Sequence, residues 1–280
     1  MISVIIPAHN ESAVIARTLR TLINTAGPGE LEIVVVCNGC TDDTPAVARR
    51  FGLPVRVVET NLASKTHALN VGDAVACSFP RVYLDADVVV TSGTLRCMAR
   101  RLETGDVLAV APRADVDLSG CSWPVRVFYE VRSLLPSASE GIGGSGVYAL
   151  SEAGRQRFRI FPAITADDGY VRLQFRPEER ETLDFVASTV FPPRTIKALL
   201  AIRTRAHYGS FELKNLYPQL WENRIASNNQ ALTRLFHDPR LWLKLAIYCL
   251  ISLVAQHRAK RRVPGGRMRW ERDNTSRATA

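Results

Sequence analysis

Two aspartates, Asp85 and Asp87, lie inside the run VYLDADVVV, whose other residues favour a β-strand. Aspartate is a poor strand former, and a carboxylate is rarely buried unless it is paired or bound to a cation. Two interpretations account for the pair. The side chains could cap backbone N–H groups in a tight turn, or the two carboxylates could hold a metal ion. The spacing alone leaves both open.

The first hundred residues alternate short apolar runs with stretches of helical periodicity. We expect strands at SVIIP, LEIVVV, PVRVVE, RVYLD and VLAVAP, with helices between them. This α/β alternation predicts a doubly wound, mostly parallel sheet flanked by helices. Ligands bind outside the carboxyl ends of the strands in such sheets. The segments PAHNE, CNGCTDD, TNLASK and DAD, each of which follows a strand, should therefore face one crevice.

After about residue 112 the pattern becomes irregular. Helical stretches are expected at SWPVRVFYEVRSLLP and PPRTIKALLAIRTRAHYG, and between them lie the glycine-rich run GIGGSGVYALS and the run ITADDGYVRLQF. A strongly apolar helix, RLWLKLAIYCLISLVAQHRAKRR, ends in basic residues. The predicted divisions are a domain at 1–210 with halves 1–112 and 113–210, a helical appendage at 211–263, and a flexible basic tail at 264–280.

Length and composition favour a cytosolic chain with a sizeable core. The 280 residues, 46% of them hydrophobic, can form one large domain or a domain with an appendage. We find no run of about 18 consecutive apolar residues, and the N-terminal sequence enters a strand without the basic leader of a signal peptide. The six cysteines are irregularly spaced, which does not indicate a disulfide framework.

The net charge of +9 is concentrated toward the C-terminus. From Arg194 onward there are 17 Lys and Arg against 5 Asp and Glu, whereas the first 193 residues hold 19 against 22. A basic end on a near-neutral body suggests an anionic surface as partner. The tail lacks the interleaved aromatics of a nucleic-acid platform, and its basic residues flank LWLKLAIYCLISLVA. We expect peripheral attachment to the cytoplasmic membrane and no nucleic-acid partner, with a helix packed on the domain as the alternative.

Six motifs in order resemble the family-2 nucleotide-sugar glycosyltransferases of the GT-A fold: SVIIPAHNE, VVVCNGCTDDT, SKTHALN, YLDADV, GGSGVYALS and TADDGYV. The resemblance covers about residues 2–210. It implies a Rossmann-like domain, a nucleotide-sugar donor, Mg²⁺ or Mn²⁺ as cofactor, and inverting transfer to an acceptor hydroxyl. The acceptor would be a small molecule, a polysaccharide or a glycolipid, including lipid-linked acceptors of the cell envelope.

The resemblance assigns roles to the four acidic residues. Asp87 would ligate the metal and Asp85 would lie near the ribose or donor sugar, because a hard cation takes oxygen ligands and offsets the charge of the diphosphate. Asp168 would be the general base, and Asp167 would support it. Two adjacent carboxylates raise the proton affinity of one of them, which suits a base at neutral pH. A helix cap is the alternative for this second pair.

The resemblance also assigns residues to the donor and the acceptor. The nucleobase and ribose would contact Pro7, Ala8, Asn10, Glu11 and Asn38. CNGC departs from the family, which usually has two acids where Cys37 and Asn38 stand, so the identity of the base stays open. The donor sugar and the acceptor would be lined by Gly144, Ser145 and Gly146, since glycines permit close backbone approach.

Basic residues would meet the diphosphate. By resemblance Lys65, before the ALN helix, contacts the nucleotide or its diphosphate. The run RTRAHYG stands where related enzymes carry an arginine-rich segment that closes over the diphosphate, which makes Arg203, Arg205 and His207 candidates. His207 is also a second candidate metal ligand. The tryptophan of the family's segment is missing here.

Other functions fit single motifs. LDADVVVTSGTL resembles the D-x-D-x-T loop of haloacid-dehalogenase-type phosphatases, but Val89 stands where that loop has threonine. CNGC could be a thioredoxin-like redox pair or part of a zinc site. A non-enzymatic protein could bind nucleic acid through the basic tail. The six ordered motifs favour the glycosyltransferase interpretation over these alternatives.

Overall fold

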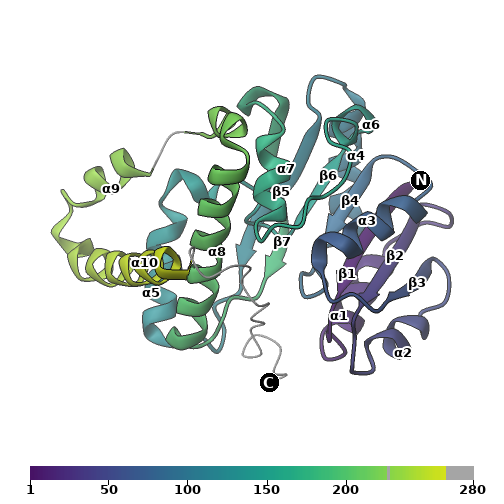
Figure 1. Ribbon diagram of the computed structural model, residues 1–280, viewed down its shortest axis with the longest axis horizontal. Coiled ribbons are helices and arrows are strands. Elements are labelled where there is room, and N and C mark those ends of the chain that lie inside the picture. Colours follow the sequence, from purple (N-terminus) through teal and green to yellow (C-terminus); the bar gives the residue numbers. More distant parts are fainter. Residues whose placement is uncertain (226–227, 263–280) are drawn as a thin grey trace.

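The computed structural model describes residues 1–225 and 228–262 (Figure 1). One seven-stranded sheet has the order β3-β2-β1-β4-β6-β5-β7. Its strands are β1 (Ile2–Ala8), β2 (Leu31–Asn38), β3 (Val55–Thr60), β4 (Arg81–Leu84), β5 (Ala109–Val116), β6 (Val147–Leu150) and β7 (Arg180–Val190).

Helices connect the strands and extend beyond the last one. They are α1 (Ile15–Ile23), α2 (Thr44–Arg49), α3 (Lys65–Val75), α4 (Ser92–Glu103), α5 (Trp123–Ser133), α6 (Glu152–Arg155), α7 (Asp167–Leu173), α8 (Ile196–Leu216), α9 (Asn229–Leu235) and α10 (Trp242–Arg262). Short 3-10 turns are η1 (Pro136–Ala138), η2 (Pro177–Glu179), η3 (Pro218–Asn223) and η4 (Pro239–Leu241).

The first four strands confirm the predicted parallel, doubly wound sheet. β1 pairs in parallel with both β2 and β4, and β2 pairs in parallel with β3. β6 is antiparallel to β4, with Val147 opposite Leu84. This reversal places the start of β6 at the carboxyl end of β4. The glycine-rich loop before β6 therefore reaches the same edge of the sheet as the Asp85–Asp87 turn.

Helices cover both faces of the sheet because the strands are apolar on both sides. All seven residues of β1 are buried. Successive residues of β1 enter different clusters: Ile6 packs in the cluster that includes Leu19 of α1, and Ile5 packs in the cluster that includes Leu69 of α3. Burial of side chains on both faces fixes the register, since a one-residue slip would exchange the two sets.

The C-terminal helices pack on the second half of the chain (Figure 1). Phe128 of α5, Leu199 of α8 and Ile251 of α10 share one cluster. α8 runs through the predicted boundary at residue 210, so that boundary does not separate two structural units. β7 and α9 were not predicted. The predicted tail at 264–280 lies outside the described residues.

The last helix, α10, covers residues 242–262 of the apolar segment for which a helix was predicted. The segment Pro239–Arg261 has the length and hydropathy of a membrane-crossing helix, although core helices of water-soluble proteins meet the same criterion. Only 17% of its most apolar window is buried. Leu245, Ala255 and Ala259 are buried, whereas Leu243 and Leu250 are 64% and 63% exposed. One face of α10 therefore packs on the protein and another faces outward.

Candidate active site

The two aspartates of the opening motif form a turn whose backbone is held by its neighbours. The N–H of Asp85 donates to the Gly146 carbonyl (2.9 Å), which anchors the turn to the start of β6. From α1, Thr18 Oγ1 donates to the Ala86 carbonyl (2.8 Å) and Arg17 Nη2 to the Asp87 carbonyl (3.1 Å). The side chains of Asp85 and Asp87 both line a cavity of about 1520 Å³ at this edge of the sheet.

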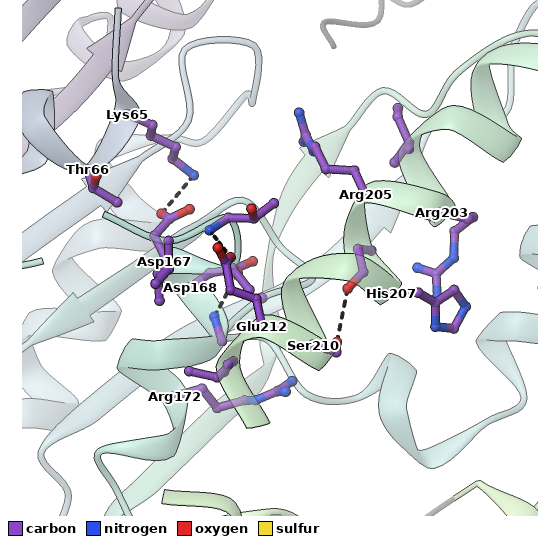
Figure 2. A pocket seen from close by; sticks show the side chains of 18 of the residues that line it. Lys65, Thr66, Asp167, Asp168, Arg172, Arg203, Arg205, His207, Ser210 and Glu212 are labelled. Atoms are coloured by element: carbon purple, nitrogen blue, oxygen red, sulfur yellow. Dashed lines mark hydrogen bonds and ion pairs between the residues drawn. The ribbon is translucent and has the colours of Figure 1, made fainter. Parts of the chain in front are cut away.

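Lys65 joins two acidic segments that are far apart in the sequence. It is the first residue of α3, whose N-cap Ser64 accepts a hydrogen bond from the His67 N–H. Its Nζ lies 2.9 Å from Asp85 Oδ1 and 3.0 Å from Asp167 Oδ2. Figure 2 shows Lys65 pointing toward Asp167, with Asp168 beside it. The predicted diphosphate lysine and three of the four predicted acids therefore meet at one place.

Burial and charge shift proton affinities in this cluster. Burial raises the pKa of Asp167 to about 6, and Asp168 and Asp85 add to that rise, although the nearby Lys65 opposes it. Burial alone would lower the pKa of the Lys65 ammonium, but Asp167, Asp85 and Asp168 outweigh that effect and raise it. Lys65 is therefore charged at neutral pH. From the sequence we expected Asp168, the predicted base, to have the raised pKa. In the structure the raised pKa belongs to Asp167, the buried member of the pair.

Asp168 lies at the start of α7, where it is only partly buried. Its Oδ1 accepts from the Gly169 N–H (2.7 Å). Gly143 packs against it: φ is +93° there, and a Cβ on Gly143 would come within 3.3 Å of Asp168 Oδ2. The alternative of a simple cap does not describe Asp167, whose carboxylate is ion-paired with Lys65. Gly143 was not predicted, because the sequence GIGGSG contains four glycines and does not show which of them lies against Asp168.

The loops after β1 and β2 are bound to each other. Asn38 Nδ2 donates to the Ala8 carbonyl (2.9 Å), and His9 Nδ1 lies 2.6 Å from the Asn38 carbonyl oxygen. Asn10 has φ +55° and accepts from the Thr41 N–H (2.7 Å) through Oδ1. The cavity wall includes Pro7, Glu11, Asn38 and His9. Ala8 and Asn10 do not line this cavity, and their contact with the nucleobase and ribose stays a prediction.

The glycine-rich loop divides between the site and the core. Gly146, at φ +66°, lines a small adjoining cavity of about 20 Å³ together with Lys65 and Asp85. Ser145 is fully buried and its Oγ lies 2.8 Å from the Gly141 carbonyl oxygen. Ser145 and Gly144 line neither cavity, and the expectation that they contact sugar or acceptor is not supported by their placement.

The candidates on α8 point in different directions. Figure 2 shows Arg203 and His207 together on one side of the helix and Asp167 and Asp168 beyond its other side. Arg205 extends away from the Arg203–His207 side. Burial, together with Arg203, lowers the pKa of His207 to about 4. His207 lies beside Arg203 and across α8 from Asp167 and Asp168, and its role as a second metal ligand stays a prediction.

The carboxylates fit a divalent cation that also contacts a substrate. Within residues 1–225 and 228–262, no group of three or more His, Cys, Asp and Glu side chains is arranged to hold a metal ion. Mg²⁺ is usually bound through one or two carboxylates plus substrate phosphates and water, so a complete protein cage is not needed. Asp87 and Asp85, both on the cavity wall, are the residues that would supply those carboxylates. Cys37 and Cys40 are free thiols.

The comparisons with known proteins agree with this site. The sequence profile of glycosyl transferase family 2 matches residues 3–142, half of the chain. A 4,4'-diaponeurosporenoate glycosyltransferase of Staphylococcus aureus (strain MRSA252) is 34% identical over 91 residues, which are 31% of this chain and 24% of that protein. The match thus spans about a quarter of the curated relative's length.

Solved structures share the fold. A mannosyltransferase from Pyrobaculum calidifontis in complex with GDP-Man and Mn²⁺ has a TM-score of 0.60 and 22% identity, covering 95% of this chain and 76% of that one. Glucosyl-3-phosphoglycerate synthase from Mycobacterium tuberculosis, in complex with Mn²⁺, UDP and glucosyl-3-phosphoglycerate, has a TM-score of 0.57 and 20% identity, covering 77% of this chain and 79% of that one. By its matched profile, this chain belongs to glycosyl transferase family 2.

Proposed function

We propose that the protein transfers a sugar from a nucleoside diphosphate to an acceptor hydroxyl in one inverting displacement. The observation that carries this proposal is the meeting of Lys65, Asp85 and Asp167 at the carboxyl ends of the strands, on a cavity that Asp87 and Asp168 also line. Membership of glycosyl transferase family 2 supports it. The relatives solved with GDP-Man or UDP and Mn²⁺ support a nucleotide-sugar donor and a divalent cation.

The residues divide the work of the proposed reaction. Asp87, with Asp85 beside it, would hold Mg²⁺ or Mn²⁺, which supplies charge neutralisation to the leaving diphosphate. Lys65 fixes the side chains of Asp85 and Asp167 and keeps their charge from repelling the donor. Asp168, more exposed than Asp167, removes the proton of the acceptor hydroxyl as it attacks the anomeric carbon.

A donor panel tests this function. UDP-, GDP- and dTDP-sugars are added to the full chain with Mn²⁺ or with EDTA, and the unfolding temperature is followed by scanning fluorimetry. Binding to the native state raises the unfolding temperature by mass action. We expect at least one donor to stabilise the protein, and only in the presence of Mn²⁺. Stabilisation by no donor, or equally in EDTA, would contradict the proposal.

We also propose that α10 attaches the enzyme to a membrane surface. Trp242, Leu243 and Leu250 are 58%, 64% and 63% exposed, and the basic residues Arg258, Lys260 and Arg261 follow on the same helix. An outward apolar face followed by cations suits the interface of an anionic bilayer. The buried Leu245 and Ala255 keep the other face on the protein.

Vesicle sedimentation tests the attachment. The full chain should sediment with vesicles that contain phosphatidylglycerol, and Leu243→Asp combined with Leu250→Asp should weaken that binding by at least about 10-fold, because each exposed leucine contributes over 1 kcal/mol when it enters the bilayer. Leu53→Asp is the matched control, since Leu53 is 95% exposed on the other half of the molecule. Equal effects of both changes would contradict a specific role for α10.

A further inference from the structure

A second group of basic side chains lies between α5, α8 and α10. Arg203 and His207 of α8 and Arg132 of α5 line the same large cavity as the acidic site, but from another side. Figure 2 shows Arg203 and His207 across α8 from Asp167 and Asp168. Tyr248 of α10 also lines this part of the cavity. We call the region formed by these four residues the basic recess.

Among the described residues, no carboxylate balances the buried charge of Arg203 in the basic recess. Arg203 Nε and His207 Nε2 are buried and have no hydrogen-bond partner among the described residues. The Arg203 guanidinium lies 5.7 Å from the centre of the Phe128 ring, a contact that compensates only part of a buried charge. Arg132 is the charged side chain near Arg203, and the phenols of Tyr129 and Tyr248 also lie nearby.

The protonation states follow from this arrangement. Burial, with Arg132 adding to its effect, lowers the pKa of Arg203 to about 10, so its guanidinium is charged at neutral pH. His207, with its pKa lowered to about 4, is neutral and has one ring N–H to donate. A buried cation beside an unused donor is costly in an empty site, because buried polar groups are normally paired. An anion would satisfy both groups.

Apolar side chains continue the basic recess outward. Ile202, Leu232 and Leu253 line the same cavity. Leu253 is 63% exposed and lies on α10, close to the outward face that carries Leu250. A ligand seated in the basic recess therefore has apolar side chains of the same cavity available to a hydrocarbon chain.

We propose that the basic recess binds the anionic group, a phosphate or a carboxylate, of an acceptor with a hydrocarbon chain. As an acceptor subsite it rests on the proposed transferase activity. The anionic group anchors the acceptor at Arg203, His207 and Arg132, while its reacting hydroxyl reaches Asp168 through the shared cavity. The hydrocarbon chain lies against Leu232 and Leu253 and leaves the protein along α10.

Calorimetric titration of the full chain with dodecyl phosphate, below its micelle concentration, tests the proposal. Arg203→Met should weaken binding at least about 30-fold, because truncating one partner of a buried charge pair is costly. Arg203→Lys should recover part of the affinity. Arg224→Gln is the control, because Arg224 lines the same cavity but is exposed, and it should change the affinity less than about 2-fold.

Titration with inorganic phosphate measures the contribution of the anionic group without a hydrocarbon chain. Inorganic phosphate should bind more weakly than dodecyl phosphate. The unfolding temperature separates ligand binding from packing: Arg203→Met should leave the ligand-free protein at least as stable as the wild type, since the charge it removes is unpaired. A less stable Arg203→Met variant with wild-type affinity would overturn the proposal, as would equal binding of both phosphates. Arg132→Met gives an independent second variant and should also lose affinity.

Titration with a nucleotide sugar and Mn²⁺ distinguishes this inference from the proposed function. Arg203 lies across α8 from Asp167 and Asp168, so under this inference it contacts the acceptor and not the donor diphosphate expected from the sequence; Arg203→Met should then bind the donor as the wild type does. A wild-type protein that binds the donor but not dodecyl phosphate would overturn the inference and leave the transferase standing. A wild-type protein that binds dodecyl phosphate but no donor would overturn the transferase and the acceptor role together.

Discussion

The two ends of α3 carry buried charges in contrasting arrangements. Near its C-terminal end, Asp73 accepts from Arg81 Nη1 (2.6 Å) and from the Tyr83 hydroxyl (2.8 Å), and is also ion-paired with Arg155. One carboxylate is shared by two guanidiniums and a phenol. At the other end, one ammonium, Lys65, lies between carboxylates and opens onto the large cavity.

The contrast separates structure from function. The Asp73 cluster lies at the amino end of β4, where two guanidiniums share one carboxylate, and none of these three side chains lines the large cavity. The Lys65 cluster lies at the carboxyl end of the same strand. Asp85 and Asp167 are ion-paired with one ammonium and Asp168 lies close by, so negative charge remains for a cation to meet. Buried ion pairs away from the cavity hold the fold together, whereas an excess of carboxylates on the cavity wall indicates a cation or ligand.

The largest expected effect is on the proposed reaction. Asp168→Asn keeps the volume and hydrogen bonding of the side chain but cannot take a proton, and removal of a general base costs about 10²–10⁴ in rate. Single-turnover transfer, or donor hydrolysis with water as acceptor, measures the rate, and titration measures donor affinity, which should stay near wild type. Asp167→Asn should be milder. An Asp168→Asn variant with the wild-type rate would place the base elsewhere.

The next effect compares the two clusters directly. Lys65→Met and Asp73→Asn each leave buried charge without its partner, and each should lower the free energy of unfolding by about 3–5 kcal/mol. Only Lys65→Met should also lose donor binding. Chemical denaturation and donor titration of both variants provide the test. If Asp73→Asn impaired donor binding as strongly as Lys65→Met, the two ends of α3 would not differ in function.

A smaller effect depends on pH. The pKa of Asp167 is about 6 in the folded protein and about 3.9 in the unfolded chain. Between about pH 4 and pH 6 the folded protein therefore binds a proton at Asp167 that the unfolded chain does not. Its contribution to stability is therefore present below about pH 4 and is lost as the pH rises through 6, a decrease of about 2–3 kcal/mol. The free energy of unfolding of wild type relative to Asp167→Asn, measured from pH 4 to pH 7, should fall by that amount. A flat difference would contradict the burial of this charge.

The first half of the fold was predictable because buried parallel strands leave continuous apolar runs, as in β1 and β2. β7 was missed because its residues alternate and include charges, and Phe185 on it is 76% exposed. An edge strand such as β7, which is only partly buried, lacks the continuous apolar run by which a central strand is recognised in the sequence.

The candidate site was predictable where motifs follow strands, as for Lys65, Asp85 and Asp87. The segment on α8 was not, although helical spacing held a signal: Arg203 and His207 are four residues apart and share a face, whereas Arg205 lies on another. Which of Asp167 and Asp168 is the buried acid depends on the position of Lys65. Lys65 is far from both in the sequence, so the TADD motif alone does not show which of them it pairs with.

The most direct test of the account is calorimetric titration of a nucleotide sugar into wild type and Asp87→Ala, each with Mn²⁺ and with EDTA. Asp87 lies in a turn held by its backbone, so the variant should keep the wild-type unfolding temperature. The account predicts that wild type binds the donor only with Mn²⁺, and that the affinity of Asp87→Ala with Mn²⁺ falls to the level measured in EDTA. Unchanged Mn²⁺-dependent binding by Asp87→Ala would contradict the metal-bound donor site.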